Sequence, residues 1–216
     1  MQTPIKNLNN INYRETLNEK TANIALNLIR NSKSSGYIKS TIGEYKNCNN
    51  AEAISAGFIS HGEIIGKTDA ELGWKRSANT LTLNDSIVIN GRIPITLLEK
   101  GIFNRKLTDV LTKKFPIVDN KGNVIALLGL TIPAQCNDND LISFNKISAF
   151  INCIYSGIFK EPELSIINLI TKSIPQKRII VELDISQSTI TKKKRLIYTK
   201  LGLEREEDLF VLFPPN

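Results

Sequence analysis

The chain has 216 residues, 41% of them hydrophobic, which suffices for one large or two small domains with a buried core and excludes a disordered protein. Its formal net charge of +7 favours acidic partners such as nucleic acid or an anionic membrane surface. No apolar run could cross a bilayer, the start MQTPIKNLNN has no signal-peptide core, and the three cysteines form no CxxC pair. We therefore expect a cytoplasmic protein with reduced thiols, no metal site and no membrane partner.

A helix is expected close to the N-terminus, within a segment that we assign to residues 1–36. From Leu17 onward, apolar side chains recur on one face of a 3.6-residue helix: Leu17, Ile24, Ala25, Leu28 and Ile29. The helix should end between Asn31 and Gly36. Its apolar face indicates packing against the next domain, and a role in dimer formation is the alternative.

Residues 37–135 have the texture of an α+β domain, in which turn signals such as Asn90-Gly91 separate short apolar runs. The clearest part is the pair Phe115–Val118 and Val124–Leu130, which flanks the polar stretch Asp119-Asn120-Lys121-Gly122. Two such runs around a short polar loop predict an antiparallel hairpin at the end of the domain.

Two motifs in this domain resemble those of PAS domains. The first is Asn50-Ala51-Glu52-Ala53 followed by Ile64-Ile65-Gly66-Lys67-Thr68-Asp69, Leu72 and Trp74; the second is the hairpin, continued by Leu128-Gly129-Leu130-Thr131. The resemblance implies a five-stranded antiparallel sheet with flanking helices, around an interior that holds a small ligand or cofactor in many relatives. The customary Asp-Ile-Thr after the last strand is replaced by Thr131-Ile132-Pro133. The resemblance therefore permits a small-molecule ligand. A fold does not identify its ligand or cofactor, so both remain unknown.

Several side chains of this domain could serve a ligand, and each also has a structural interpretation. His61 is the only histidine, but it lies in the polar turn Ser60-His61-Gly62-Glu63, which favours a surface residue over a haem ligand. Tyr45, Phe58 and Trp74 could line a pocket, although aromatic side chains at such positions more often belong to the core. Cys48 stands in no flavin-binding or redox motif, and we expect it to be structural.

Residues 136–159 are predicted to form a linker helix that begins after a polar segment, with Asp140 as its N-cap and Gly157 near its end. Apolar residues recur in it at spacings of three and four: Phe144, Ile147, Ile151, Ile154 and Ile158. This spacing is typical of a coiled-coil seam and indicates self-association. Packing of the same face onto the chain's own sensor domain is equally compatible with the pattern.

Residues 160–216 are predicted to form four short helices: Glu163–Thr171, Pro175–Leu183, Ser186 to about Lys200, and Arg205–Leu212. Pro162 and Pro175 suit first helical turns, Ser186 can cap the third helix, and Gly202 can end it. Their apolar residues would supply one small shared core: Leu164, Ile167, Leu169, Ile170, Ile179, Ile180, Leu183, Ile190, Leu196, Ile197 and Leu201.

The stretch from Leu183 through Ile185-Ser186 to Ile190, followed by Lys200-Leu201-Gly202-Leu203, resembles the LuxR-type helix-turn-helix in spacing and without insertion. The family's usual Leu-Thr-x-x-Glu opening is replaced here by Glu161-Pro162-Glu163-Leu164. The resemblance implies that the helix beginning at Ser186 enters the DNA major groove, and that the last helix contributes Leu209 and Leu212 to a homodimer. The predicted fold class is therefore α+β, a PAS-like antiparallel sheet domain followed by an all-α helix-turn-helix domain.

Double-stranded DNA is the expected partner, because basic residues crowd the same stretch. The candidate DNA-binding residues are Lys177, Gln187, Ser188, Thr191, Lys192, Lys193, Lys194 and Arg195. Gln187 and Ser188, near the start of the third helix, could contact base edges, whereas the lysines and the arginine are suited to phosphates. The acidic cluster of the last helix, Glu204, Glu206, Glu207 and Asp208, should point away from the phosphates.

The sequence favours a DNA-binding transcriptional regulator that is controlled by its sensor domain. An enzyme is disfavoured, because no Gly-x-Ser-x-Gly elbow, phosphate loop or metal-ligand cluster is found. The alternative is a protein-interaction adaptor whose helix-turn-helix no longer binds DNA.

Overall fold

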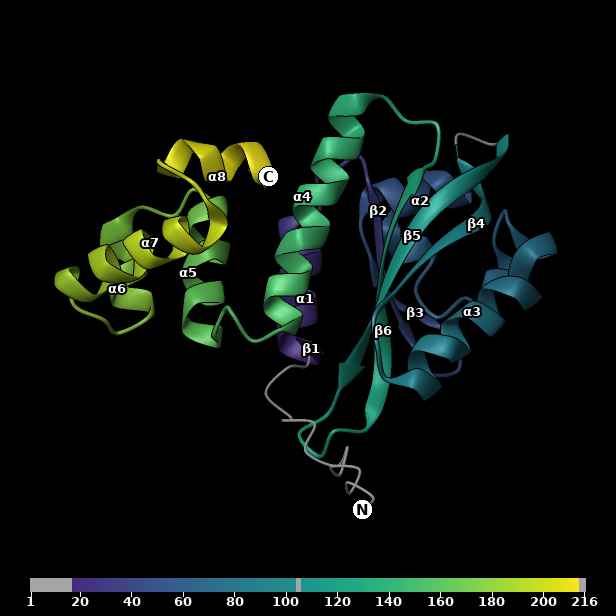
Figure 1. The fold of residues 1–216 in the computed structure, drawn as a ribbon, viewed down its shortest axis with the longest axis horizontal. Helices are drawn as coiled ribbons and strands as arrows, with labels where there is room; N and C mark the ends of the chain where they lie inside the picture. The colour runs from purple at the N-terminus through teal and green to yellow at the C-terminus, as the bar shows by residue number, and fades with distance from the viewer. Residues whose placement is uncertain (1–16, 104–105, 214–216) are drawn as a thin grey trace, which may run out of the picture.

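The computed structural model describes residues 17–103 and 106–213, so the first sixteen residues of the segment 1–36 lie outside it (Figure 1). The first part contains β1 (Leu17–Asn18), α1 (Glu19–Leu28), β2 (Ser35–Ser40), β3 (Tyr45–Cys48), α2 (Asn50–Ala56), three 3-10 turns (His61–Glu63, Asp69–Glu71, Lys75–Ser77), α3 (Ala78–Gly91), β4 (Ile95–Phe103), β5 (Lys106–Val118) and β6 (Val124–Pro133). The helices α4 (Asp138–Tyr155), α5 (Glu161–Thr171), α6 (Gln176–Glu182), α7 (Gln187–Leu201) and α8 (Glu206–Leu212) follow.

The strands form one sheet, in which β3, β2, β6, β5 and β4 lie side by side in that order and pair antiparallel. The predicted hairpin is β5 and β6, both longer than expected. The two-residue β1 adds a sixth strand: it pairs parallel with β5, Leu17 opposite Ile117. The Asn90-Gly91 turn signal ends α3, and Arg92 takes a left-handed conformation there with φ 56°. The predicted α+β fold class, a PAS-like antiparallel sheet followed by helices, is confirmed.

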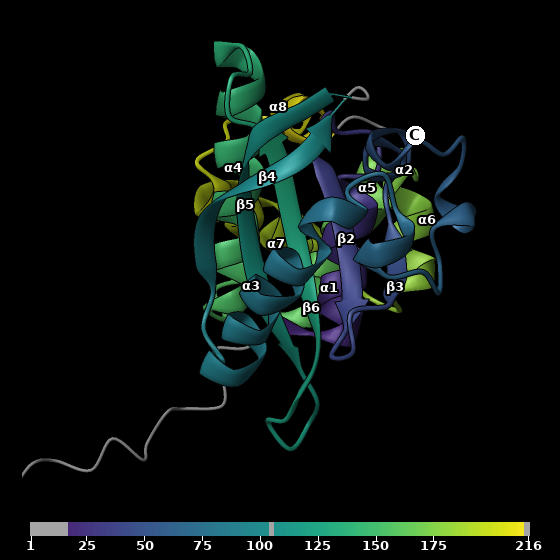
Figure 2. The same cartoon turned by 90° about the vertical axis from the view of Figure 1, so that its right-hand side faces the viewer.

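Both faces of the sheet are covered (Figures 1 and 2). Successive side chains of a strand point to opposite faces, and in β6 the neighbours Leu127 and Leu128 are both fully buried. Leu128 belongs to the core shared with α1 and α4, whereas Leu127 belongs to a second core with Tyr37 and Trp74. This second core lies between the sheet and α2, α3 and the turns that join them.

Helix α1 packs on the sheet and on α5, as the first interpretation of its apolar face predicted. The helix is capped by Asn18, whose Oδ1 accepts from the backbone N of Thr21 at 2.9 Å. It ends at Leu28, earlier than expected, because the chain turns there and Gly36 is already part of β2.

The apolar seam of α4 packs against other parts of the same chain. Phe144, Ile147, Ile151 and Ile154 are buried against the sheet and its neighbouring helices, whereas Ile158 lies beyond the helix and is 45% exposed. Packing onto the chain's own sheet domain is therefore the alternative that the structure shows. The N-cap is Asn137 and not Asp140, because Asn137 Oδ1 accepts from the backbone N of Asp140 at 2.9 Å, which places Asp140 inside the first turn.

The four C-terminal helices agree with the predicted ones to within two residues at each end. Ser186 caps α7 by accepting from the backbone N of Thr189 at 3.1 Å, and Gly202 ends it with φ 66°. Leu196 was predicted to lie in the core, and this prediction was wrong. Its side chain is 48% exposed, because Ile190 and Ile197 form the inner face of α7.

The two halves of the chain share one continuous core. The ring of Phe150 in α4 lies 5.4 Å from that of Phe159 and 4.8 Å from that of Phe213, just after α8. In the described part of the chain, none of the helices is both long and apolar enough to cross a membrane.

Candidate nucleic-acid interface and ligand cavity

The helices α6 and α7 are joined by a short turn in which Asp184 takes a left-handed conformation with φ 49°. The backbone N of Ile185 donates to the oxygen of Ile180 at 3.1 Å and closes the turn. The inner faces bury Ile179, Ile190 and Ile197. Since these apolar residues anchor one side of α7, its other side is directed to solvent.

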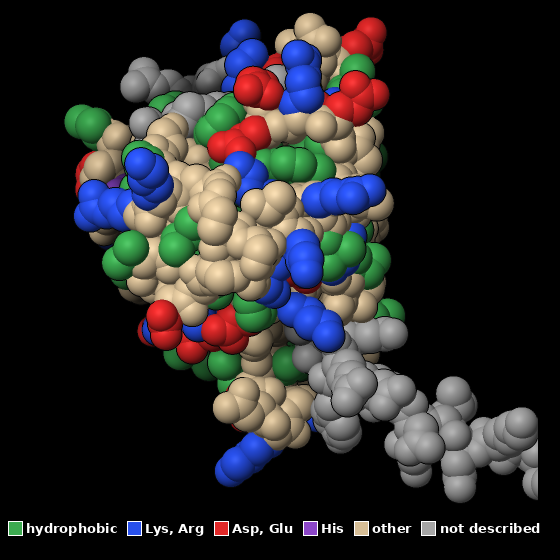
Figure 3. Space-filling model, turned by 90° about the vertical axis from the view of Figure 1, so that its left-hand side faces the viewer, with side chains coloured by type: hydrophobic (Ala, Val, Ile, Leu, Met, Phe, Trp, Pro, Cys, Tyr) green, Lys and Arg blue, Asp and Glu red, His purple; other side chains and the backbone are tan. Residues whose placement is uncertain are grey.

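The exposed side of α7 carries most of the predicted DNA-binding residues. The side chains of Gln187, Ser188, Thr191, Lys192 and Arg195 are exposed, and so is Lys177 on α6, while Lys193 is half-buried. Figure 3 looks onto this end of the molecule and shows Lys and Arg side chains spread across it. The face thus presents polar groups at the helix N-terminus and cations farther along, the arrangement expected for base-edge and phosphate contacts.

Lys194 is placed differently from the other seven candidates. Its ammonium contacts the carboxylate of Glu206 in α8 and lies 3.2 Å from Oε1 of Gln176, and its side chain is only 17% exposed. Tyr198 donates from Oη to the same carboxylate of Glu206 at 3.1 Å, and burial together with this carboxylate raises the pKa of Tyr198. Lys194 therefore ties α7 to its neighbours, and Glu206, one of the expected outward-facing acids, lies against α7.

Helix α8 is taken up by contacts within the chain. Leu209, which the resemblance assigned to a dimer contact, is fully buried where α8 meets α4. The side chain of Leu212 lies outside the described residues. Any contact between two copies that involves Leu209 therefore requires α8 to leave α4.

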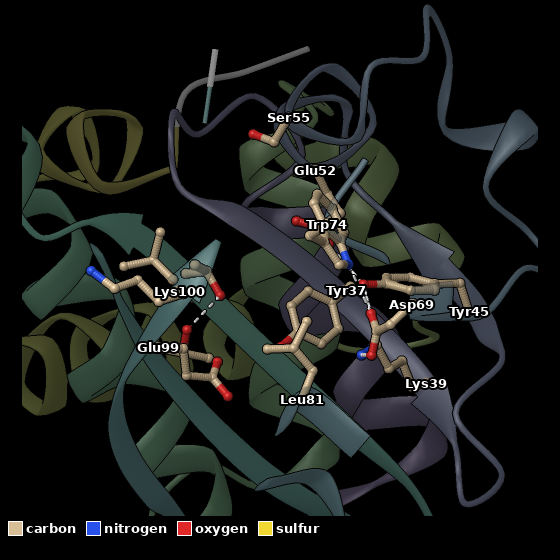
Figure 4. Close-up of a pocket in the computed structure, with 13 residues that line it drawn as sticks. Tyr37, Lys39, Tyr45, Glu52, Ser55, Asp69, Trp74, Leu81, Glu99 and Lys100 are labelled. Carbon is tan, nitrogen blue, oxygen red and sulfur yellow. Dashed lines mark hydrogen bonds and ion pairs between the residues drawn. The ribbon is translucent and has the colours of Figure 1, made fainter. Parts of the chain in front are cut away.

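A cavity of about 40 Å³ lies in the second layer of the sheet domain (Figure 4). Three aromatic side chains, Tyr37, Tyr45 and Trp74, line it together with four nearly buried charged ones: Lys39, Glu52, Asp69 and Glu99. Gly129 permits this arrangement, since Tyr37 crosses it and a Cβ there would lie 2.1 Å from the tyrosine ring. The volume has room for roughly three water-sized groups.

A chain of ion pairs runs behind the cavity wall. Lys39 Nζ lies 2.5 Å from Asp69 Oδ2 and 3.1 Å from Asp85 Oδ2. Lys114 Nζ lies 2.6 Å from Asp85 Oδ1 and 2.9 Å from Glu99 Oε1. Asp69 also accepts from Trp74 Nε1 at 2.9 Å and Tyr45 Oη at 3.0 Å. Each of the two ammonium groups is thereby shared between two carboxylates.

Glu52 is the buried carboxyl without a lysine partner in the described structure. Its Oε1 lies 3.1 Å from Tyr45 Oη. Burial raises the pKa of Glu52 to about 7, against the lowering effect of the Lys39 charge. The carboxyl therefore keeps a proton to a higher pH than an ordinary glutamate does.

Sequence reasoning found only part of this cavity. It named Tyr45 and Trp74 as pocket candidates, and both line the cavity while also belonging to the core. Phe58 packs at the margin of that core, His61 is exposed, and Cys48 is buried with its pKa raised by burial to about 12. The ion-pair chain was missed: Lys39, Asp85, Glu99 and Lys114. A lysine inside an apolar strand was the only signal that could have revealed it.

The fold and the sites thus define a PAS-like sheet domain joined to a helix-turn-helix unit. No protein-family model and no curated protein sequence matches the chain. The solved structures of related shape include two of VqmA and one of a PAS domain. A Vibrio cholerae VqmA dimer, described in terms of DNA binding by LuxR-type receptors, is 16% identical over 86% of this chain and 83% of its own, with a TM-score of 0.46.

A phage VqmA–DPO complex is 17% identical over 87% of this chain and 85% of its own, with a TM-score of 0.46. The PAS domain of Bordetella pertussis BvgS is 17% identical over 61% of this chain and 98% of its own, also with a TM-score of 0.46.

Proposed function

We propose that this protein is a DNA-binding transcriptional regulator whose PAS-like domain senses a small ligand and controls the helix-turn-helix. The observation that carries the proposal is the solvent-facing side of α7, where Gln187, Ser188, Thr191, Lys192 and Arg195 are exposed together. A helix that presents short polar side chains at its N-terminus and cations behind them suits the major groove and its phosphates. The three cysteines are free thiols, which suits the cytoplasm.

In this proposal Gln187 and Ser188 contact base edges. Lys177, Lys192, Lys193 and Arg195 contact phosphates, and Thr191 lies between the two groups. Lys194 supports the domain through Glu206 and does not reach DNA. Two copies of the chain would bind a two-fold symmetric site, since helix-turn-helix proteins commonly bind such sites as homodimers.

The contact between the helix-turn-helix and the sheet domain supports control by the sensor. Helix α5 packs on α1, and α8 packs on α4, so a change in the sheet layer can reach both ends of the helix-turn-helix. A ligand alters this arrangement only if it binds one conformation better than another.

The test is selection of genomic DNA fragments by the full chain, followed by binding of the enriched site across a salt series. The variant Lys192→Ala/Lys193→Ala/Arg195→Ala should weaken binding about tenfold or more and flatten the salt dependence by about 0.9 for each phosphate that is no longer neutralised. The matched control, Lys75→Ala/Arg76→Ala/Lys121→Ala, removes three exposed cations from the sheet domain and should leave binding unchanged.

Equal losses in the two variants would show that net charge alone drives binding. If the full chain enriches no site and the α7 variant behaves like the wild type, the proposed regulator function is wrong. The protein is then better explained as a protein-interaction adaptor.

A further inference from the structure

We infer that the cavity of the sheet domain binds a compact protonated amine. The inference rests on the proposed sensing function and specifies the chemical class of the sensed ligand.

Negative charge exceeds positive charge among the buried side chains of the sheet domain. Between residues 37 and 135, the buried charged side chains in the described structure are two lysines and four carboxylates: Lys39, Lys114, Glu52, Asp69, Asp85 and Glu99. Their net charge is −2 when all are ionised. Taking charge out of water is costly unless it is paired, so a cation in the cavity would relieve the excess. Protonation of Glu52 removes one of the two excess negative charges, which agrees with the raised pKa of this carboxyl.

Carboxylates outnumber ammonium groups among the buried side chains that line the cavity. Three carboxylates line it, Glu52, Asp69 and Glu99, against the one buried ammonium of Lys39, which Asp69 and Asp85 already share. Lys100 also borders the cavity, but its side chain is 61% exposed and pairs with Asp109. Among the described residues that line the cavity, an anionic ligand would therefore meet carboxylates and no cation that lacks a carboxylate partner.

Aromatic rings form part of the cavity wall. The faces of Tyr and Trp rings attract cations, and aromatic cages are a common means of binding ammonium groups. In this cavity Lys39 Nζ already lies 5.2 Å from the ring centre of Tyr37 and 4.9 Å from that of Tyr45. Trp74 adds a third ring beside them, as Figure 4 shows. The wall therefore combines aromatic faces with excess negative charge, and its volume limits the ligand to a few non-hydrogen atoms.

Trp74 also supplies the measurement, because it is the only tryptophan in the chain. Its indole N–H donates to Asp69 at the cavity wall, so a ¹H–¹⁵N correlation spectrum of the full chain contains one indole signal that reports on this site. The probes are ethylammonium, ethanol and acetate, which are alike in size and differ in charge, each added at constant ionic strength, with potassium chloride as a fourth probe.

We expect ethylammonium to move the indole signal in a saturable way, with an affinity in the millimolar range because so few atoms make contact. Ethanol, acetate and potassium should leave it in place. Glu99→Gln and Glu52→Gln should each weaken the response at least about fivefold, whereas Glu44→Gln, which changes a surface carboxylate of the same domain, should not.

The titration of the wild-type protein tests the inference even if a variant of a buried residue fails to fold. A saturable response to acetate, an equal response to ethanol or potassium, or no response to ethylammonium would each overturn the inference. The titration contains no DNA, and the DNA selection requires no added amine. Loss of DNA binding with a normal titration would therefore refute only the proposed regulator function. Normal DNA binding without a response to ethylammonium would refute only the inferred amine ligand.

Discussion

Lys113 and Lys114 are adjacent in β5, yet they occupy opposite faces of the sheet. Lys114 is fully buried and holds Asp85 and Glu99, whereas Lys113 is half-buried on the other face. The sequence could not reveal this difference, because the partners of Lys114 come from α3 and β4 and a strand pattern does not show which face will be covered. Tyr45 and Trp74, which the sequence offered as possible pocket residues and favoured as core residues, line the cavity and also belong to the core.

These two lysines allow a matched comparison of stability. Lys114→Met should lower the free energy of unfolding by about 3–5 kcal/mol, since it leaves two buried carboxylates without their cation. Lys113→Met should change it by less than about 1 kcal/mol. Urea unfolding of both variants measures the difference, and similar costs for the two would show that the ion-pair chain does not stabilise the fold.

Glu52 makes stability depend on pH. Its pKa rises from an ordinary 4.5 to about 7 on folding, so folding takes up a proton between these values. The stabilising contribution is complete below pH 4.5 and is lost as pH rises through 7, by about 3 kcal/mol in total.

Glu52→Gln should remove this pH dependence and unfold at a higher temperature than the wild type at pH 8. Thermal unfolding at pH 5 and pH 8 tests it, with Glu44→Gln as the control that keeps the wild-type slope. If Glu52→Gln keeps that slope as well, the raised pKa does not belong to this residue.

At the scale of elements, local signals located the C-terminal helices well. Ser186 and Gly202 act within one turn of α7, so a short stretch of sequence contains the whole cause of the helix boundary. By contrast, β1 has only two residues and exists because β5 offers an edge beyond the end of β4. The seam of α4 was equally compatible with two partners, because spacing describes the shape of an apolar face and not what covers it.

The joint between α4 and α8 depends on Phe150. Replacing it with Ala should cost about 3–5 kcal/mol, because Phe159 and Phe213 would both border the cavity left behind. Leu141→Ala, at an exposed position of the same helix, should cost less than about 1 kcal/mol. Urea unfolding measures both, and a small cost at Phe150 would mean that α8 does not rest on α4 in solution.

At the scale of the whole molecule, the larger core runs from β1 to Phe213 without interruption. The boundaries after residues 36, 135 and 159 remain a prediction, and the first of them falls within β2. The number of independently stable parts is a property that sequence motifs do not reveal, because motifs describe each half by itself.

We expect the full chain to unfold in one cooperative transition, since the apolar contacts of α1 and α4 join both halves. Calorimetry should give a calorimetric enthalpy equal to the van't Hoff enthalpy. Two resolved transitions would show that the sheet domain and the helix-turn-helix are stable apart.

The position of α1 between the sheet and α5 also bears on synthesis of the chain. Lys20 in α1 pairs with Glu161 in α5, a partner that the ribosome adds 141 residues later. At a translation rate of about 5–20 residues per second, the α5-facing side of α1 stays uncovered for roughly 7–28 seconds. During that interval the nascent helix is open to chaperones and to neighbouring chains, and final burial of α1 must await completion of the C-terminal half.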